Sequence, residues 1–63
     1  MKQNIIDELI KDGFEVEKET DAVVIMARKL KRNKVDLVQI KNGEITGELN
    51  GITEVEAKAI IGA

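Results

Sequence analysis

Few residues of this chain are suited to chemistry, because it contains no histidine and no cysteine. Histidine is the commonest acid-base catalyst near neutral pH, and cysteine is the strongest ordinary nucleophile. The two also supply most ligands of structural zinc. Carboxylates, lysines and arginines remain, and no pair of carboxylates stands apart from the others as a catalytic pair would. We therefore expect no enzymatic activity, no cofactor, no metal site and no small-molecule substrate.

The clearest charged feature is a basic run in the middle of the chain. Half of the ten lysines and arginines lie within residues 28–34, namely Arg28, Lys29, Lys31, Arg32 and Lys34. Such a run can neutralise the carboxylates of a protein or the phosphates of a nucleic acid. It is a candidate contact with a partner, and the alternative is a solvated loop whose charges oppose aggregation.

Carboxylates form a second charged feature, an acidic face made of Glu15, Glu17, Glu19 and Asp21. Residues at every second position of a strand share one face and lie about 6–7 Å apart. This row is expected to be a solvated strand face, and the alternative is a surface that imitates the phosphates of a nucleic acid. It lacks the spacing and the glycine of a calcium-binding loop.

Two helices are expected to flank these features. Apolar residues at helical spacing predict a helix over about residues 4–12, and Gly13 is expected to end it in a left-handed conformation. Near the other end of the chain, Thr53 and Glu56 have the spacing of a capping box. That box predicts a second, short helix over about residues 54–61.

Alternating and β-branched residues between the helices predict four strands, over about residues 14–19, 22–29, 35–41 and 44–49. We expect turns at residues 20–21, at Asn42-Gly43 and at Asn50-Gly51. The predicted fold is therefore α+β, a single domain over residues 1–63 with the order α-β-β-β-β-α. An antiparallel meander of three or four strands packs on the N-terminal helix, and a short helix ends the chain.

A two-residue turn at 20–21 would place Val16 opposite Ile25, and Phe14 opposite Ala27, on the face that meets the first helix. The opposite face would then carry a second apolar set, a possible interface made of Val24, Met26, Val35 and Leu37. The C-terminal helix, a second copy in a homodimer, or a different protein are the three candidates to cover it.

These observations favour a small non-enzymatic module for protein-protein interaction, or an inhibitor that covers a surface of its partner. In size and composition alone the chain is similar to accessory proteins of bacteriophages and mobile elements. One alternative is a dimeric nucleic-acid-binding regulator that uses the basic residues 28–34, and another is a structural homo-oligomer subunit. No apolar run is long enough for a membrane helix and no signal peptide is evident, so we expect no membrane partner and a cytoplasmic location.

Overall fold

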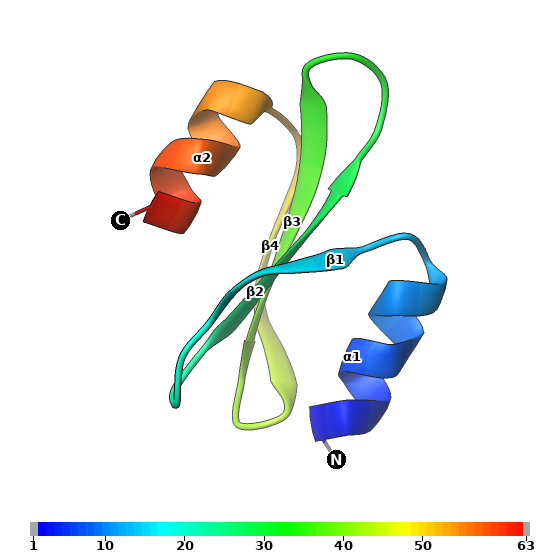
Figure 1. Cartoon of the computed structure of the whole chain (residues 1–63), viewed down its shortest axis with the longest axis vertical. Coiled ribbons are helices and arrows are strands. Elements are labelled where there is room, and N and C mark those ends of the chain that lie inside the picture. Colours follow the sequence, from blue (N-terminus) through cyan, green and yellow to red (C-terminus); the bar gives the residue numbers. More distant parts are fainter. Residues whose placement is uncertain (1, 63) are drawn as a thin grey trace.

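One antiparallel sheet forms the centre of the protein, and its four strands are ordered in space as they are in the chain. The computed structural model describes residues 2–62. The elements are α1 (Lys2–Lys11), β1 (Glu15–Glu19), β2 (Val24–Lys29), β3 (Lys34–Lys41), β4 (Glu44–Thr53) and α2 (Glu54–Gly62). The predicted α+β class and the order α-β-β-β-β-α are confirmed (Figure 1).

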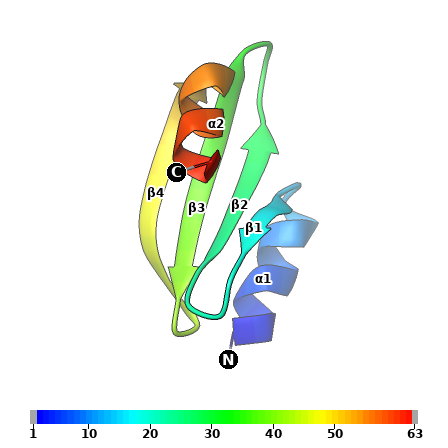
Figure 2. The same ribbon diagram turned by 60° about the vertical axis from the view of Figure 1, so that its left-hand side comes forward.

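The two helices lie on opposite faces of the sheet (Figures 1 and 2). Below α1 lies a cluster made of Phe14, Met26, Val38 and Ile40, with Ile5, Ile6, Leu9 and Val24 packed against it. Below α2 lies a cluster made of Val35, Leu37 and Ala57, with Ile25, Ala27, Ile52 and Ile61 packed against it. Each face of the sheet thus packs on one helix of the same chain, and α2 packs on the face opposite α1.

The end of α1 and the start of α2 have the backbone and side-chain hydrogen bonds that the sequence predicts. At the end of α1, Gly13 has a φ of 100°, and the amide of Phe14 donates to the carbonyl of Leu9 at 2.9 Å. This is a Schellman ending, and it turns Phe14 into the core. At the start of α2, the amide of Glu56 donates to the Thr53 hydroxyl at 3.1 Å, and the Thr53 amide donates to the Glu56 carboxylate at 3.2 Å. The predicted capping box is confirmed.

The connection between β1 and β2 differs from the expected two-residue turn. The Thr20 hydroxyl accepts hydrogen bonds from the amides of Ala22 and Val23, and the Thr20 amide donates to the Val23 carbonyl at 2.8 Å. The loop is therefore longer, and β2 begins at Val24. A shift of one residue moves every side chain of a strand to the other face. The prediction that Ile25 faces α1 is thus wrong.

The hairpin between β3 and β4 follows its prediction. Asn42 and Gly43 both have positive φ angles, 54° and 78°, as a type I′ turn requires. Ile40 pairs with Ile45, as expected. The turn predicted at Asn50-Gly51 is wrong, because β4 continues to Thr53 and absorbs the extra residues in a bulge.

Candidate protein-binding surface at the basic loop

A short loop, residues 30–33, joins β2 to β3 at one end of the sheet, and Lys34 directly after it is the first residue of β3 (Figure 1). The Leu30 amide donates to the Lys34 carbonyl at 2.9 Å, and the Lys34 amide donates to the Lys31 carbonyl at 3.0 Å. Asn33 takes the left-handed conformation, with a φ of 62°. These hydrogen bonds and the left-handed residue close a tight loop between the two strands. We call residues 30–34 the basic loop.

A third hydrogen bond ties the basic loop to the rest of the fold. The amide of Glu54, the first residue of α2, donates to the Asn33 carbonyl at 3.2 Å. The loop is thus held by its own turn and by the start of a helix. Hydrogen bonds thus hold its backbone, and its lysine and arginine side chains are exposed.

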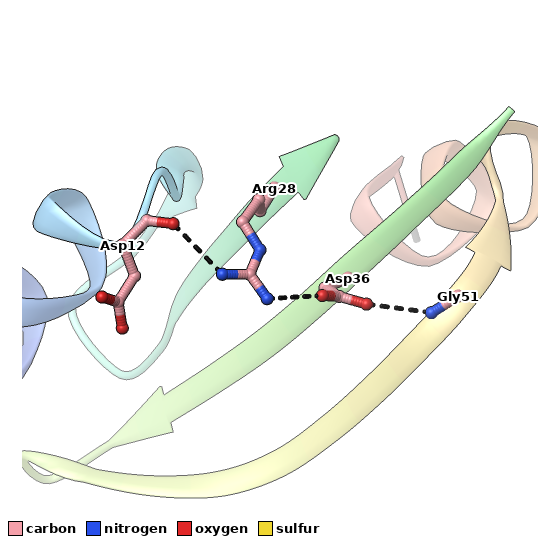
Figure 3. Close-up of polar contacts among 4 residues, drawn as sticks. All are labelled: Asp12, Arg28, Asp36 and Gly51. Atoms are coloured by element: carbon pink, nitrogen blue, oxygen red, sulfur yellow. Dashed lines mark hydrogen bonds and ion pairs between the residues drawn. The ribbon is translucent and has the colours of Figure 1, made fainter. Parts of the chain in front are cut away.

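Arg28 does not belong to the exposed basic surface, because its guanidinium is used inside the fold (Figure 3). Its Nη2 lies 2.8 Å from Oδ2 of Asp36, and its Nη1 donates to the carbonyl of Asp12 at 3.1 Å. The same group lies 4.6 Å from the centre of the Phe14 ring, within range of a cation-π contact. Arg28 therefore joins β2 and β3 to the end of α1.

Asp36 is the buried partner in this network, with 8% of its side chain exposed. Its second oxygen, Oδ1, accepts a hydrogen bond from the amide of Gly51 at 2.9 Å (Figure 3). The hydrogen bond from Arg28 is the largest cause that lowers the pKa of Asp36. Burial acts in the opposite direction, and the Gly51 amide and the charge of Arg28 lower the pKa further. The carboxylate thus stays charged and holds the bulge of β4 against β3.

Lys29 is also paired, although its side chain remains mostly in solvent. Its Nζ lies 3.3 Å from a carboxylate oxygen of Glu54. The other three members of the basic run, Lys31, Arg32 and Lys34, are exposed and form no ion pair with the residues that the structure describes. Of the five predicted contact residues, Arg28 is thus used inside the fold, Lys29 forms an exposed pair with Glu54, and the other three form no ion pair among the described residues.

A shallow apolar depression adjoins these available charges. It has a volume of about 580 Å³ and is lined by Leu30, Lys31, Lys34 and Gly51. Leu30 is 46% exposed and is the apolar side chain of this depression. Alternate residues of a strand share a face, so Lys34 lies on the same face as Asp36 and Val38, the face of α1. The depression therefore opens on the side of the sheet away from α2.

The acidic residues are all exposed, but they do not form one row. A bulge at Glu17 interrupts the pairing of β1 with β2. Glu15 pairs with Ala27, which faces α2, whereas Glu19 pairs with Val24, which faces α1. Asp21 lies beyond the strand, in the loop. The prediction of a single acidic face is wrong, because the bulge turns the strand between the glutamates.

The predicted apolar interface is also divided between the two faces. Val24 and Met26 pack toward α1, whereas Val35 and Leu37 pack toward α2. Met26 is fully buried, with 0% of its surface exposed. These four residues therefore do not form one surface.

The described residues include neither a metal-binding cluster nor a helix suited to a membrane. Within residues 2–62, no group of three Asp or Glu side chains is placed to hold a metal ion. Neither of the helices in this part of the chain is long and apolar enough to cross a membrane. Comparisons with family models, with curated proteins and with solved structures found no match to this chain. The basic loop is therefore the candidate site among the described residues.

Three residues matter to this surface in ways that the sequence did not indicate. In the sequence, Asp36 is the one acid within a basic segment. Only the fold shows that its side chain is buried and accepts hydrogen bonds from Arg28 and Gly51. Leu30 was one apolar residue among cations. The sequence predicts Gly51 in a turn. In the structure, β4 extends to Thr53, and this places Gly51 beside the basic loop.

Proposed function

We propose that this protein is a non-enzymatic binding module that covers an acidic surface of another protein with its basic loop. The observation that carries the proposal is the division within the basic run. Arg28 and Lys29 have carboxylate partners in the chain, whereas Lys31, Arg32 and Lys34 lie exposed without an ion pair among the described residues. Cations left without internal partners are free to pair with carboxylates of a partner.

The backbone of the basic loop supports this role energetically. Three hydrogen bonds fix its turn and attach it to α2, so little backbone order must be gained on binding. Clustered charges of one sign raise the association rate and select partners of opposite sign. A partner with an acidic patch is thus favoured over the many basic and neutral surfaces in a cell.

The proposal includes a mode of action. A module of this size that binds one surface acts by occluding it, as an inhibitor does. The general similarity in size and composition to accessory proteins of bacteriophages and mobile elements supports this action, and the proposal includes a cytoplasmic location for the module and its partner. Action as a homodimer belongs to the same proposal, because two basic loops would then engage one partner more tightly than one.

The test compares two variants of equal net charge. In the first, Lys31, Arg32 and Lys34 are changed to Glu. In the second, three exposed lysines outside the loop are changed to Glu, namely Lys11, Lys41 and Lys58. Proteins captured from a lysate of the source organism by the wild type should be lost with the loop variant and kept with the control. Equal capture by both variants would refute the role of the loop.

Arg28 is left unchanged in this design. Its guanidinium holds Asp36 and the end of α1, so a glutamate there would place a second carboxylate beside a buried one. Loss of binding by an Arg28→Glu variant would thus report unfolding rather than a missing contact.

Nucleic acid is the second candidate, and the same three exposed cations are the observation that favours it. Under this alternative, a duplex of about 20 base pairs should bind at low salt, and its affinity should fall steeply as salt is raised. No shift of any duplex or single strand at low salt would eliminate the alternative. Binding of DNA by the wild type and the control variant, without any protein partner, would favour it over the first proposal.

A further inference from the structure

The basic loop is not purely charged, and its one apolar member is well placed for binding. Leu30 lines the shallow depression of about 580 Å³ between Lys31, Lys34 and Gly51. It is 46% exposed, so about half of its surface remains to be covered by a partner. An apolar floor with lysines beside it combines a hydrophobic contact with opposite-charge pairing.

Gly51 leaves the other side of this depression open. A Cβ atom built on Gly51 would meet no atom within 4 Å. The residue has a φ of 67°, and Asp36 fixes its amide at 2.9 Å. A bound side chain can therefore lie over Leu30 and beside the backbone of Gly51, where the chain itself has no side chain.

We propose that the depression formed by Leu30, Lys31, Lys34 and Gly51 binds an acidic peptide segment that carries one large apolar side chain between its carboxylates. The apolar side chain covers Leu30, and the carboxylates pair with Lys31 and Lys34. This inference rests on the proposed function and adds to it the chemistry of the partner. The partner is thus specified by an acidic-hydrophobic pattern rather than by charge alone.

A protein segment suits this site better than a nucleic acid does. A phosphate backbone offers no apolar group of the size that would cover Leu30. Stacking with a base needs an accessible aromatic ring, but the chain's one aromatic, Phe14, is buried in the cluster below α1 with Arg28 against it.

The test is a titration of the isotope-labelled protein, followed by NMR, with the peptide acetyl-Glu-Asp-Leu-Glu-Asp-amide. We expect saturable shifts of the amide signals of Leu30, Lys31, Lys34 and Gly51. The same peptide with serine in place of its leucine should bind about fivefold more weakly, because it no longer covers the exposed half of Leu30. Absence of shifts at these amides would overturn the inference, as would equal affinity of the two peptides.

Two variants of the protein test the site from the other side. Leu30→Ser should weaken binding of the leucine peptide about fivefold. Its matched control is Leu49→Ser, because Leu49 is 45% exposed but lies on the face of α2, opposite Leu37. Gly51→Asn should also weaken binding, because asparagine tolerates a positive φ and its side chain would fill the open side of the depression.

The outcomes separate this inference from the proposed function. Loss of partner capture by the Lys31, Arg32 and Lys34 charge reversal, together with normal capture by Leu30→Ser and Gly51→Asn, would overturn the inference and keep the function. Normal capture by all these variants would overturn both. Tighter binding of a DNA duplex than of the leucine peptide at equal salt would also overturn the inference.

Discussion

Replacement of Asp36 by asparagine should destabilise the protein far more than its small chemical change suggests. The carboxylate accepts hydrogen bonds from Arg28 at 2.8 Å and from the Gly51 amide at 2.9 Å. Asparagine keeps one oxygen, which can serve one of these donors, and presents an amide to the other. The variant thus loses one hydrogen bond to a charged group from a position that is 8% exposed.

A hydrogen bond to a charged group contributes about 1.5–3 kcal/mol. Arg28 is 37% exposed and can turn partly to water, so we expect a loss of about 2 kcal/mol rather than the upper value. A domain of 63 residues has a total stability of roughly 3–9 kcal/mol. The melting temperature should therefore fall by about 10 °C.

The measurement is chemical and thermal unfolding of Asp36→Asn beside a matched control. Asp21→Asn removes the same charge from an exposed position in the loop between β1 and β2. It should change the stability by less than about 0.5 kcal/mol. An equal effect of the two variants would refute the assignment of Asp36 as the residue that holds the bulge of β4.

A double-mutant cycle isolates the pair with Arg28. Arg28→Met, Asp36→Asn and the double variant should show a coupling of about 1–2 kcal/mol. The hydrogen bond to Gly51 stays outside this coupling, because Arg28 does not take part in it. Additive effects would show that Asp36 acts through Gly51 alone.

The same pair predicts a dependence on pH. The hydrogen bond from Arg28 lowers the pKa of Asp36 in the folded state, so its stabilisation is fully present above the unfolded value of about 4. It is lost as the pH falls through the lower pKa of the folded state. The difference in stability between wild type and Asp36→Asn should shrink on going from about pH 7 to about pH 2. A constant difference over this range would contradict the cause given for the lowered pKa.

Three further predictions test the fold and its assembly. Gly51→Ala should cost about 1–2 kcal/mol because φ is 67°, whereas Gly62→Ala, in α2 with open space around it, should gain up to about 1 kcal/mol, as measured by urea unfolding. Thr53→Ala should lower the stability by about 1 kcal/mol through loss of the capping box, and an unchanged melting temperature would contradict this role. The proposed homodimer should have twice the mass of one chain by light scattering, and the mass of one chain at high concentration would refute it.

The parts of the fold with strong local signals could be predicted from the sequence. Gly13 ends α1, the Thr53 box starts α2, and Asn42-Gly43 forms its hairpin, because each depends on residues within one or two turns of chain. The face assignment in β2 could not be predicted in this way. The side chain of Thr20 extends the loop by its own hydrogen bonds, and that single shift exchanges the positions of Ile25 and Met26.

The candidate surface could be predicted only in part. The sequence indicates a cluster of cations at 28–34, but nothing local shows that Arg28 reaches a buried Asp36 and leaves the exposed surface. The contribution of Gly51 depends on a bulge in β4, which is a property of strand pairing rather than of the residues themselves. Long-range contacts of this kind separate Arg28, which is bonded inside the fold, from the exposed cations of the basic loop.

The role of the basic loop is tested most directly by the affinity of a captured partner for the two charge-reversal variants at equal salt. Substitution of glutamate at Lys31, Arg32 and Lys34 should weaken binding at least tenfold, because three attractive contacts become repulsive. The control with Lys11, Lys41 and Lys58 changed to glutamate has the same net charge as the loop variant but keeps the basic loop unchanged, so it should bind within about threefold of the wild type. Equal weakening of the two variants would show that net charge, and not the basic loop, governs binding, and would contradict the account.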